Sequence, residues 1–171
     1  TPAPFVRPTH MDAEAFAELV DAHADGMYRF AYSLLKEEDA AEDAVQDAFE
    51  GLWRKRKTVT PGKYKSYLFT SVHNRCMDAL RRRRPTVEPE VALAKLGTDT
   101  PPPHDLQTHL HEALSTLNER QQSLVLLRDY EGYSYAEIAE ITAMSLDAVK
   151  VNLFRARRAL RDQLGTLTHW V

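Results

Sequence analysis

Apolar residues recur at the spacing of a helix along almost the whole chain, and no convincing two-residue alternation typical of a strand appears. The clearest stretch lies between residues 41 and 53, where an apolar stripe follows i, i+3, i+4, i+7 and i+8 spacing and acidic side chains occupy the opposite face. The stripe consists of Ala41, Ala44, Val45, Ala48, Phe49, Leu52 and Trp53. This periodicity predicts an all-α fold.

Two helices are expected before that stretch. Phe16, Leu19 and Val20 mark the first, and the apolar positions of residues 27–35 mark the second. Between them, the dipeptide at 25–26, Asp-Gly, predicts a break or kink because glycine is a weak helix former.

A further helix is expected after "TVTPG" at 58–62, which predicts a loop. From residue 64 onward, one face carries Tyr64, Leu68, Val72, Cys76 and Leu80. We expect this helix to end in the arginine run before Pro85, since the residue before a proline is biased out of the helical conformation.

Five of the chain's nine prolines lie between residues 85 and 103, so no long helix can persist there. We interpret residues 86–105 as a flexible, proline-rich linker, extended around the triple proline. The prediction is therefore two small helical domains, residues 9–85 and 106–165, joined by that linker.

Helical spacing resumes after the linker. One face of the first helix there carries Leu106, Leu110, Leu114 and Leu117. Asn118, with Gln121 three positions on, predicts a capping box at the start of the next helix, which extends to about residue 130 and is ended by the Glu-Gly pair at 131–132.

Two short helices joined by a tight turn are predicted from residue 134 to residue 160. Ser134 and Glu137 form a second capping box, and Ser145 caps the final helix. Ala143 occupies the turn position that favours a left-handed residue, where alanine costs about 1 kcal/mol relative to glycine. This pattern is typical of a helix-turn-helix, whose second helix enters the DNA major groove.

Charge is distributed unevenly, although the formal net charge is only -3. Acidic residues dominate 36–50, whereas "RKRK" at 54–57, "RRRR" at 81–84 and the stretch 150–161 are basic. Basic clusters on an acidic chain suggest local contacts with a polyanion and a separate acidic surface for another partner.

Several classes of function are disfavoured. No apolar run approaches the roughly 20 residues that cross a bilayer, the N-terminus does not read as a secretory signal, and a single cysteine fits a reducing cytoplasm. Cys76 itself is expected to be a small buried side chain.

His104, His109 and His111 do not gather on one helical face, so no metal or other cofactor is expected. No nucleophile and base pair, phosphate loop or metal motif indicates an enzyme.

Two stretches resemble one family. "LSTLNERQQSLVLLRDYEGYSYAEIAEITAMSLDAVKVNLFRARRAL" is similar to the fourth region of bacterial RNA polymerase sigma factors of the extracytoplasmic-function group. "HADGMYRFAYSLLKEEDAAEDAVQDAFEGLWRKRK" and "YLFTSVHNRCMDALRRRR" resemble the second region of the same family. These matches cover most of the chain in the family's order, which is stronger evidence than a helix-turn-helix pattern alone.

The resemblance implies a chain that binds core RNA polymerase and promoter DNA. In this family the helix holding "EDAVQDAF" docks on the clamp helices of the beta-prime subunit, the second domain docks near the beta flap, and an anti-sigma factor is a candidate regulator. The corresponding polymerase-binding residues are Asp43, Gln46, Asp47, Glu50 and Trp53. Read without the resemblance, the polar members of this set suit simple solvation.

Promoter melting requires unstacked bases to be held, and single-strand binding combines aromatic surfaces with a basic track. The resemblance assigns minus-ten DNA to Lys63, Tyr64, Tyr67, Asn74, Arg75, Arg81 and Arg82. Asn74 matches the asparagine that the family uses to hold a flipped base, and Tyr67 stands where a tryptophan is usual. Phe69 is a further candidate aromatic, and a place in the core is the alternative for both Phe69 and Tyr67.

The resemblance assigns duplex minus-thirty-five DNA to the final helix. The residues are Ser145, Asp147, Ala148, Lys150, Val151, Asn152, Arg155 and Arg158. Where the family often has "VKSRL", this chain has "VKVNL", and an asparagine suits adenine where an arginine prefers guanine. Asn152 therefore predicts an altered minus-thirty-five preference.

Two alternatives stay open at the level of sequence. One is a stand-alone helix-turn-helix regulator that binds duplex DNA as a dimer without polymerase. The other is a helical nucleic-acid hydrolase, which would need clustered catalytic groups.

Overall fold

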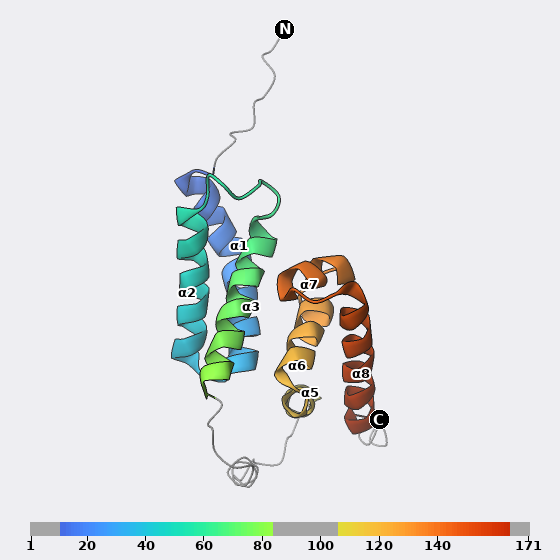
Figure 1. Ribbon diagram of the computed structural model, residues 1–171. Coiled ribbons are helices and arrows are strands. Elements are labelled where there is room, and N and C mark those ends of the chain that lie inside the picture. The colour runs from blue at the N-terminus through green and yellow to red at the C-terminus, as the bar shows by residue number, and fades with distance from the viewer. Residues whose placement is uncertain (1–10, 84–105, 165–171) are drawn as a thin grey trace.

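The computed structural model describes residues 11–83 and 106–164, except for the side chains of 106–109 and 111. Every regular element in these ranges is a helix, which confirms the predicted all-α class. The helices form an N-terminal unit of α1 to α3 and a C-terminal unit of α5 to α8, which stand next to each other (Figure 1). The predicted linker, 86–105, lies outside the described residues, as do residues 9–10, 84–85 and 165 of the predicted domains.

The N-terminal unit is a three-helix bundle of α1 (Ala13–Leu35), α2 (Glu38–Arg54) and α3 (Tyr64–Arg83). Asp12 caps α1 by accepting a hydrogen bond from the backbone N–H of Ala15 at 2.8 Å. The apolar stripe expected on α2 packs inward as predicted, with its buried members being Ala41, Ala44, Ala48, Phe49 and Leu52. Burial of this stripe leaves the acidic face of α2 in solvent.

The break expected at Asp25-Gly26 is wrong, because α1 runs through both residues without interruption. Gly26 is buried, and a Cβ atom added there would lie 3.0 Å from Oε2 of Glu131 in the C-terminal unit. The glycine therefore serves a close approach between the two units, which sequence alone does not reveal.

α3 places Leu68, Val72 and Cys76 in the core, as its apolar spacing predicts. Burial raises the pKa of the Cys76 thiol to about 12, so the side chain behaves as the small hydrophobe expected from the sequence. The loop predicted at 58–62 separates α2 from α3.

The C-terminal unit consists of α5 (Leu106–Thr116), α6 (Glu119–Val125), its continuation as a π-helical turn η2 (Leu126–Tyr130), α7 (Tyr135–Thr142) and α8 (Leu146–Leu164). Asn118 caps α6 by accepting from the backbone N–H of Gln121 at 2.8 Å. The buried apolar residues of α8 follow four, three, four spacing as predicted: Val149, Leu153, Ala156 and Leu160. These residues fix which faces of α8 point outward.

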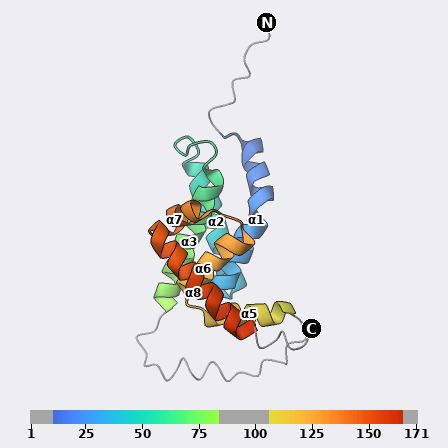
Figure 2. The ribbon, with the colours of Figure 1, turned by 90° about the vertical axis from the view of Figure 1, so that its right-hand side faces the viewer.

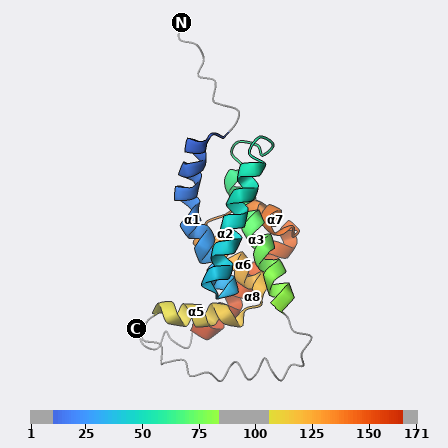
Figure 3. The ribbon, with the colours of Figure 1, turned by 90° about the vertical axis from the view of Figure 1, so that its left-hand side faces the viewer.

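The two units share one continuous hydrophobic core. Figures 2 and 3, taken from opposite sides, show the C-terminal unit covering one side of the N-terminal bundle, with α7 beside α3 and α6 beside α1. The helix that the sequence assigns to minus-ten DNA therefore faces the helix-turn-helix. Among the residues that the structure describes, none of the helices combines the length and apolar content that crossing a membrane requires.

Candidate nucleic-acid interface

The polar face of α2 presents the residues predicted to bind polymerase. Asp43, Gln46 and Glu50 are exposed, on a face opposite the buried apolar stripe. Asp47 is less accessible because its carboxylate pairs with Arg75 of α3 at 3.0 Å. Trp53 is half-buried, with the Arg56 guanidinium 4.0 Å from its ring centroid. The face thus offers a row of exposed polar and acidic groups that ends at an aromatic side chain.

The predicted aromatic contacts lie in the first turn of α3, and the predicted lysine contact lies just before it. Tyr64 and Tyr67 are both half-buried, and the Tyr67 hydroxyl lies against α2, 3.2 Å from where a Cβ of Gly51 would be. Lys63 is exposed and forms an ion pair with Glu140 of α7, 3.6 Å between Nζ and Oε2. Asn74, farther along α3, is exposed.

Phe69 belongs to the core, which decides between the two interpretations that the sequence left open. Its side chain is 1% exposed and packs edge-on against Phe30 of α1 and Tyr133 of the C-terminal unit. It therefore cannot stack on a base while the two units are in contact.

The arginines of α3 differ in their surroundings. Arg75 and Arg81 are exposed and pair with Asp47 and Asp78, both at 3.0 Å. Exposed pairs of this kind contribute only about 0–1 kcal/mol, so phosphates can replace the carboxylates. Arg82 is exposed as well.

Arg83 has a structural role, which its place in the basic run at 81–84 did not predict. Its guanidinium donates to the carbonyl oxygen of Leu35 and to the carboxylate of Glu37, each at 2.8 Å. It thereby joins the end of α3 to the connection between α1 and α2.

The helix-turn-helix has the local geometry that the sequence predicts. Ser134 and Glu137 form the expected capping box at the start of α7. Ala143 ends α7 in the left-handed conformation, with φ 57° and ψ 29°. Ser145 then accepts a hydrogen bond from the backbone N–H of Ala148 at 3.1 Å and so caps α8. Exposed Asp147 lies in the first turn, where the helix dipole favours an acidic side chain.

The outer surface of α8 carries the predicted basic contacts. Lys150, Arg155 and Arg158 are exposed. Asn152 is half-buried, and its amide Nδ2 donates to the carbonyl of Ala148 at 2.8 Å. A second amide N–H and the amide oxygen remain available to a base edge. Adenine recognition by Asn152 therefore stays a prediction.

An apolar patch on α8 was only partly found from the sequence. Phe154 is 68% exposed, Val151 is 45% exposed and Leu146 is 43% exposed. Val151 was assigned to DNA, whereas Phe154 was not. Its position one residue after the inward-facing Leu153 could have indicated an exposed aromatic ring among the basic residues.

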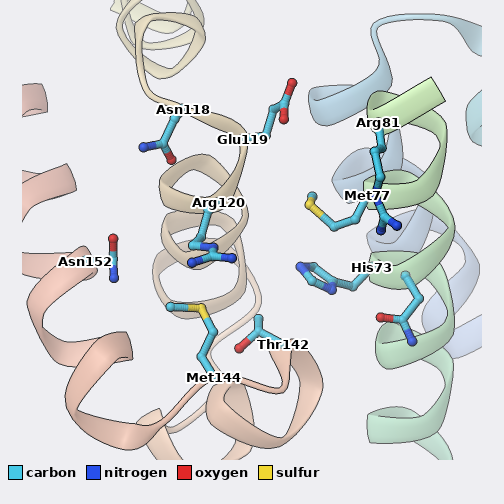
Figure 4. Close-up of a pocket in the computed structure, with 10 residues that line it drawn as sticks. His73, Met77, Arg81, Asn118, Glu119, Arg120, Thr142, Met144 and Asn152 are labelled. Carbon is cyan, nitrogen blue, oxygen red and sulfur yellow. The ribbon is translucent and has the colours of Figure 1, made fainter. Parts of the chain in front are cut away.

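The residues assigned to the two promoter elements meet at one cavity of about 650 Å³ between the units. Asn74 and Arg81 of α3 line it from one side, and Asn152 of α8 lines it from the other. Figure 4 shows His73 and Met77 reaching from α3 toward Arg120 of α6, with Met144 and Thr142 near the helix-turn-helix turn. The cavity is therefore bordered by both predicted DNA-reading helices.

No metal-binding group emerges from the part of the chain that the structure describes. His104 lies outside that part, and the side chains of His109 and His111 are not described.

Two family models match the chain in the order of its two helical units. The Sigma-70 region 2 model matches residues 19–86, and the model of Sigma-70, region 4 matches residues 108–160. The first match contains α2 and α3, and the second contains the helix-turn-helix.

Named relatives extend over most of the chain. RNA polymerase sigma factor SigV of Bacillus subtilis is 32% identical, over 83% of this chain and 86% of the relative. The ECF RNA polymerase sigma factor SigE of Mycolicibacterium smegmatis is 35% identical over 86% of this chain. The matched region spans 61% of SigE's own length.

Two solved structures superpose on this chain over most of its length. The sigma factor RpoE of Bartonella quintana, in complex with the anti-sigma factor NepR, superposes with a TM-score of 0.70 at 27% identity, covering 90% of this chain and 98% of that one. CnrH, in complex with the cytosolic domain of CnrY, gives a TM-score of 0.68 at 25% identity, covering 91% and 90%. With the family models and the named relatives, this shows that the chain belongs to the extracytoplasmic-function group of sigma-70 RNA polymerase sigma factors.

Proposed function

We propose that this sigma factor divides promoter recognition between its two units, with α3 holding the melted minus-ten element and α8 reading the minus-thirty-five element as duplex. The observation that carries the proposal is the presence of two basic, exposed helix surfaces on two units whose order matches regions 2 and 4. The chain supplies binding and positioning, and the polymerase supplies the chemistry of RNA synthesis.

We propose that α2 binds the beta-prime clamp helices of the polymerase. Gln46 and Glu50 lie four residues apart on the exposed polar face, so they present neighbouring groups to a partner helix. Acidic groups on this surface suit a basic partner and would increase the rate of association. Docking of the C-terminal unit near the beta flap is proposed from the family alone.

For the minus-ten element, the support comes from exposure and charge. Asn74 is exposed on α3, next to Arg75 and about two turns before the basic end of the helix. A basic track along one helix follows a phosphate backbone, and an asparagine amide can hydrogen-bond a flipped base. Tyr64 and Tyr67 provide half-buried rings at the start of this track.

For the minus-thirty-five element, α8 combines phosphate and base contacts. Arg155 and Arg158 suit phosphates, while Val151 and Phe154 offer an apolar surface that suits the methyl groups of thymine. Asn152 adds an amide that suits adenine. Weak contacts at two separate elements on one chain combine into a stronger overall affinity.

A change at Asn152 tests how α8 reads sequence. Asn152→Arg should shift the preferred minus-thirty-five sequence toward guanine at one position, by about 1–3 kcal/mol of discrimination, and leave polymerase binding unchanged. Selection of duplex sequences by the wild type and the variant measures this shift. Weaker polymerase binding instead would assign Asn152 a structural role.

Regulation by an anti-sigma factor is a further part of the proposal. The structures of RpoE and CnrH contain the proteins NepR and CnrY as partners, and both sigma factors share this fold. We propose that this chain is held by a protein of the same kind.

The test is transcription with purified core polymerase and this chain on a library of promoter fragments. Specific start sites that depend on the chain are expected. Gln46→Lys combined with Glu50→Lys should weaken polymerase binding at least about tenfold, because like charges would then face the partner. Asp21→Lys, at an exposed position of α1, is the charge control. If core polymerase adds nothing while the chain alone protects duplex DNA, the chain is a stand-alone regulator.

A further inference from the structure

The cavity of about 650 Å³ between α3, α6 and the helix-turn-helix has the size and the lining of a site for a small polar ligand. Pockets that hold small molecules have volumes of about 300–1,000 Å³. The side chains that line this cavity include two arginines, three asparagines and two methionines. A ligand that matches all of them carries an anionic group, an edge that both donates and accepts hydrogen bonds, and a flat apolar face.

Arg120 supplies a cation on the C-terminal side of the cavity. It is exposed in the first turn of α6 and forms no ion pair with any residue in 11–83 or 106–164. Burial lowers the pKa of His73, and the charge of Arg120 lowers it further, because the guanidinium lies close to the ring. Arg81 lines the cavity from α3, and its exposed pair with Asp78 contributes little. The two guanidinium groups therefore suit a phosphate.

Two asparagines leave amide groups available to the edge of a base. Nδ2 of Asn152 donates to the carbonyl of Ala148 at 2.8 Å, so Oδ1 and one N–H remain. With these two groups an asparagine accepts from N6 of adenine and donates to N7. Guanine presents two acceptors at the same edge, which the amide oxygen cannot match. Oδ1 of Asn118 accepts from the backbone N–H of Gln121 at 2.8 Å, which leaves the amino group of Asn118 as a further donor.

Met77 and Met144 supply apolar surface from two elements, α3 and the turn before α8. Both are half-buried, and Figure 4 shows them in the same close-up as the His73 ring. Thioether groups are polarizable and make favourable contacts with aromatic rings. His73 is 7% exposed, and its Nδ1 has no hydrogen-bond partner among the described residues. A ligand that donates to this atom would remove the cost of leaving it unpaired.

We propose that this cavity binds an adenine nucleotide. The phosphate lies at Arg120 and Arg81. The adenine ring contacts Met77 and Met144, and its N6 and N7 atoms face Asn152. Binding of a small molecule goes beyond the promoter function proposed above, because Arg120, Met77 and Met144 have no part in that function.

Titration calorimetry of the full chain with adenosine monophosphate tests the site without polymerase or DNA. We expect a Kd on the order of 10–100 μM for a ligand of this size. Adenosine and inorganic phosphate, each tested alone, should bind at least about tenfold more weakly, because each keeps only part of the contacts. Guanosine monophosphate should also bind about tenfold more weakly, because it has an acceptor where adenine has its amino group. Absence of binding by adenosine monophosphate would overturn the inference, as would equal binding by any of the three other compounds.

A matched pair of arginine variants locates the bound nucleotide. Arg120→Ala should weaken the binding of adenosine monophosphate at least about tenfold, because it removes a charge-assisted contact to the phosphate. Arg120 is exposed, so the variant is expected to fold. Arg161→Ala is the control, since Arg161 is exposed on α8 and does not line this cavity. Unchanged binding in Arg120→Ala, or equal losses in the two variants, would show that the nucleotide binds elsewhere.

Competition with DNA is a second readout, and this one rests on the promoter function proposed above. A nucleotide at Asn152 occupies the amide that is proposed to read duplex minus-thirty-five DNA. Saturating adenosine monophosphate should therefore weaken duplex binding by the chain at least about threefold, and it should have no effect on Arg120→Ala. If duplex binding stays unchanged although calorimetry shows bound nucleotide, the placement of adenine at Asn152 is wrong. If the chain binds no promoter DNA at all, the proposed promoter function fails, whereas the calorimetric result still decides the nucleotide site.

Discussion

The two helices proposed to read DNA, α3 and α8, are similar in length and charge but differ in how their basic residues are held. Arg75 and Arg81 of α3 and Lys63, the residue before it, all form ion pairs, and the pair of Lys63 crosses to the C-terminal unit. On α8, Arg155 and Arg158 are exposed and form no ion pair with any residue in 11–83 or 106–164. The basic residues named at α3 are therefore already paired with carboxylates, whereas Arg155 and Arg158 of α8 can contact phosphates directly.

This difference matches what each helix is proposed to bind. Duplex DNA presents a regular, strongly negative surface that an exposed basic helix can contact directly. Melted DNA appears only during initiation, so its binding surface is useful only when the polymerase and the promoter are both present.

The largest expected effect is a loss of stability when a core leucine of either unit is replaced. Leu153 of α8 is 1% exposed and Leu68 of α3 is 0% exposed. Replacement of either by alanine should lower the free energy of unfolding by about 2–5 kcal/mol, because it leaves a cavity. Chemical denaturation measures this loss.

The two alanine variants also separate the functions of the helices. Leu153→Ala should reduce binding of duplex minus-thirty-five DNA, whereas Leu68→Ala should reduce minus-ten binding and spare the duplex. Equal loss of both activities in both variants would mean that the units fold only together.

The next effect concerns the unpaired arginines of α8. Replacement of Arg155 and Arg158 by alanine should weaken duplex binding at all sequences and lower the salt dependence of log K by about two, since each phosphate contact contributes about 0.9. Titrations at several salt concentrations test this. Arg157→Ala is the matched control, because its guanidinium is held by Asp129 at 2.7 Å. If the slope of log K against log salt concentration falls as much in Arg157→Ala, the assignment of Arg155 and Arg158 to phosphate contacts is wrong.

A change of pH is expected to have a smaller effect on the stability of the folded chain. His73 is buried, and burial lowers its pKa; the Asn74 side chain opposes this, and the Arg120 charge lowers the pKa further. Arg81 of α3 and Glu119 of α6 are the other charged groups at the same cavity. In the unfolded chain the pKa of His73 returns toward its ordinary value of about 6.5. The unfolded state therefore binds the proton more readily, and the free energy of unfolding decreases as the pH falls below about 6.5.

Chemical denaturation should give a lower free energy of unfolding at about pH 5.5 than at about pH 8. His73→Gln removes this titrating group and should reduce the change. His23 of α1 also has a pKa lowered by burial and by the charge of Lys65, so His23→Gln is the second variant to compare. An unchanged response in His73→Gln would exclude His73 as the responsible group.

Local features could be predicted from the sequence, while the features that depend on both units could not. The capping box of Ser134 with Glu137 and the left-handed Ala143 each depend on a few neighbouring residues, and all are confirmed. Gly26 looked like a helix break, but its role depends on Glu131, more than one hundred positions away. Phe69 was ambiguous for the same reason, since Tyr133 of the other unit covers it. Periodicity identifies inward faces, but it does not show which units will meet.

The smallest expected effect compares the two units once more, at residues that end a helix in the left-handed conformation. Lys36 ends α1 and Ala143 ends α7, and both have φ 57°. Glycine adopts this conformation without the steric cost that a Cβ atom brings, but it loses more backbone entropy on folding. Ala143→Gly and Lys36→Gly should therefore each raise the free energy of unfolding by about 0.5–1 kcal/mol. Both positions are exposed, so no packing is altered. If Ala143→Gly also changes duplex affinity while Lys36→Gly does not, the alanine sets the angle at which α8 is presented to DNA, beyond its effect on stability.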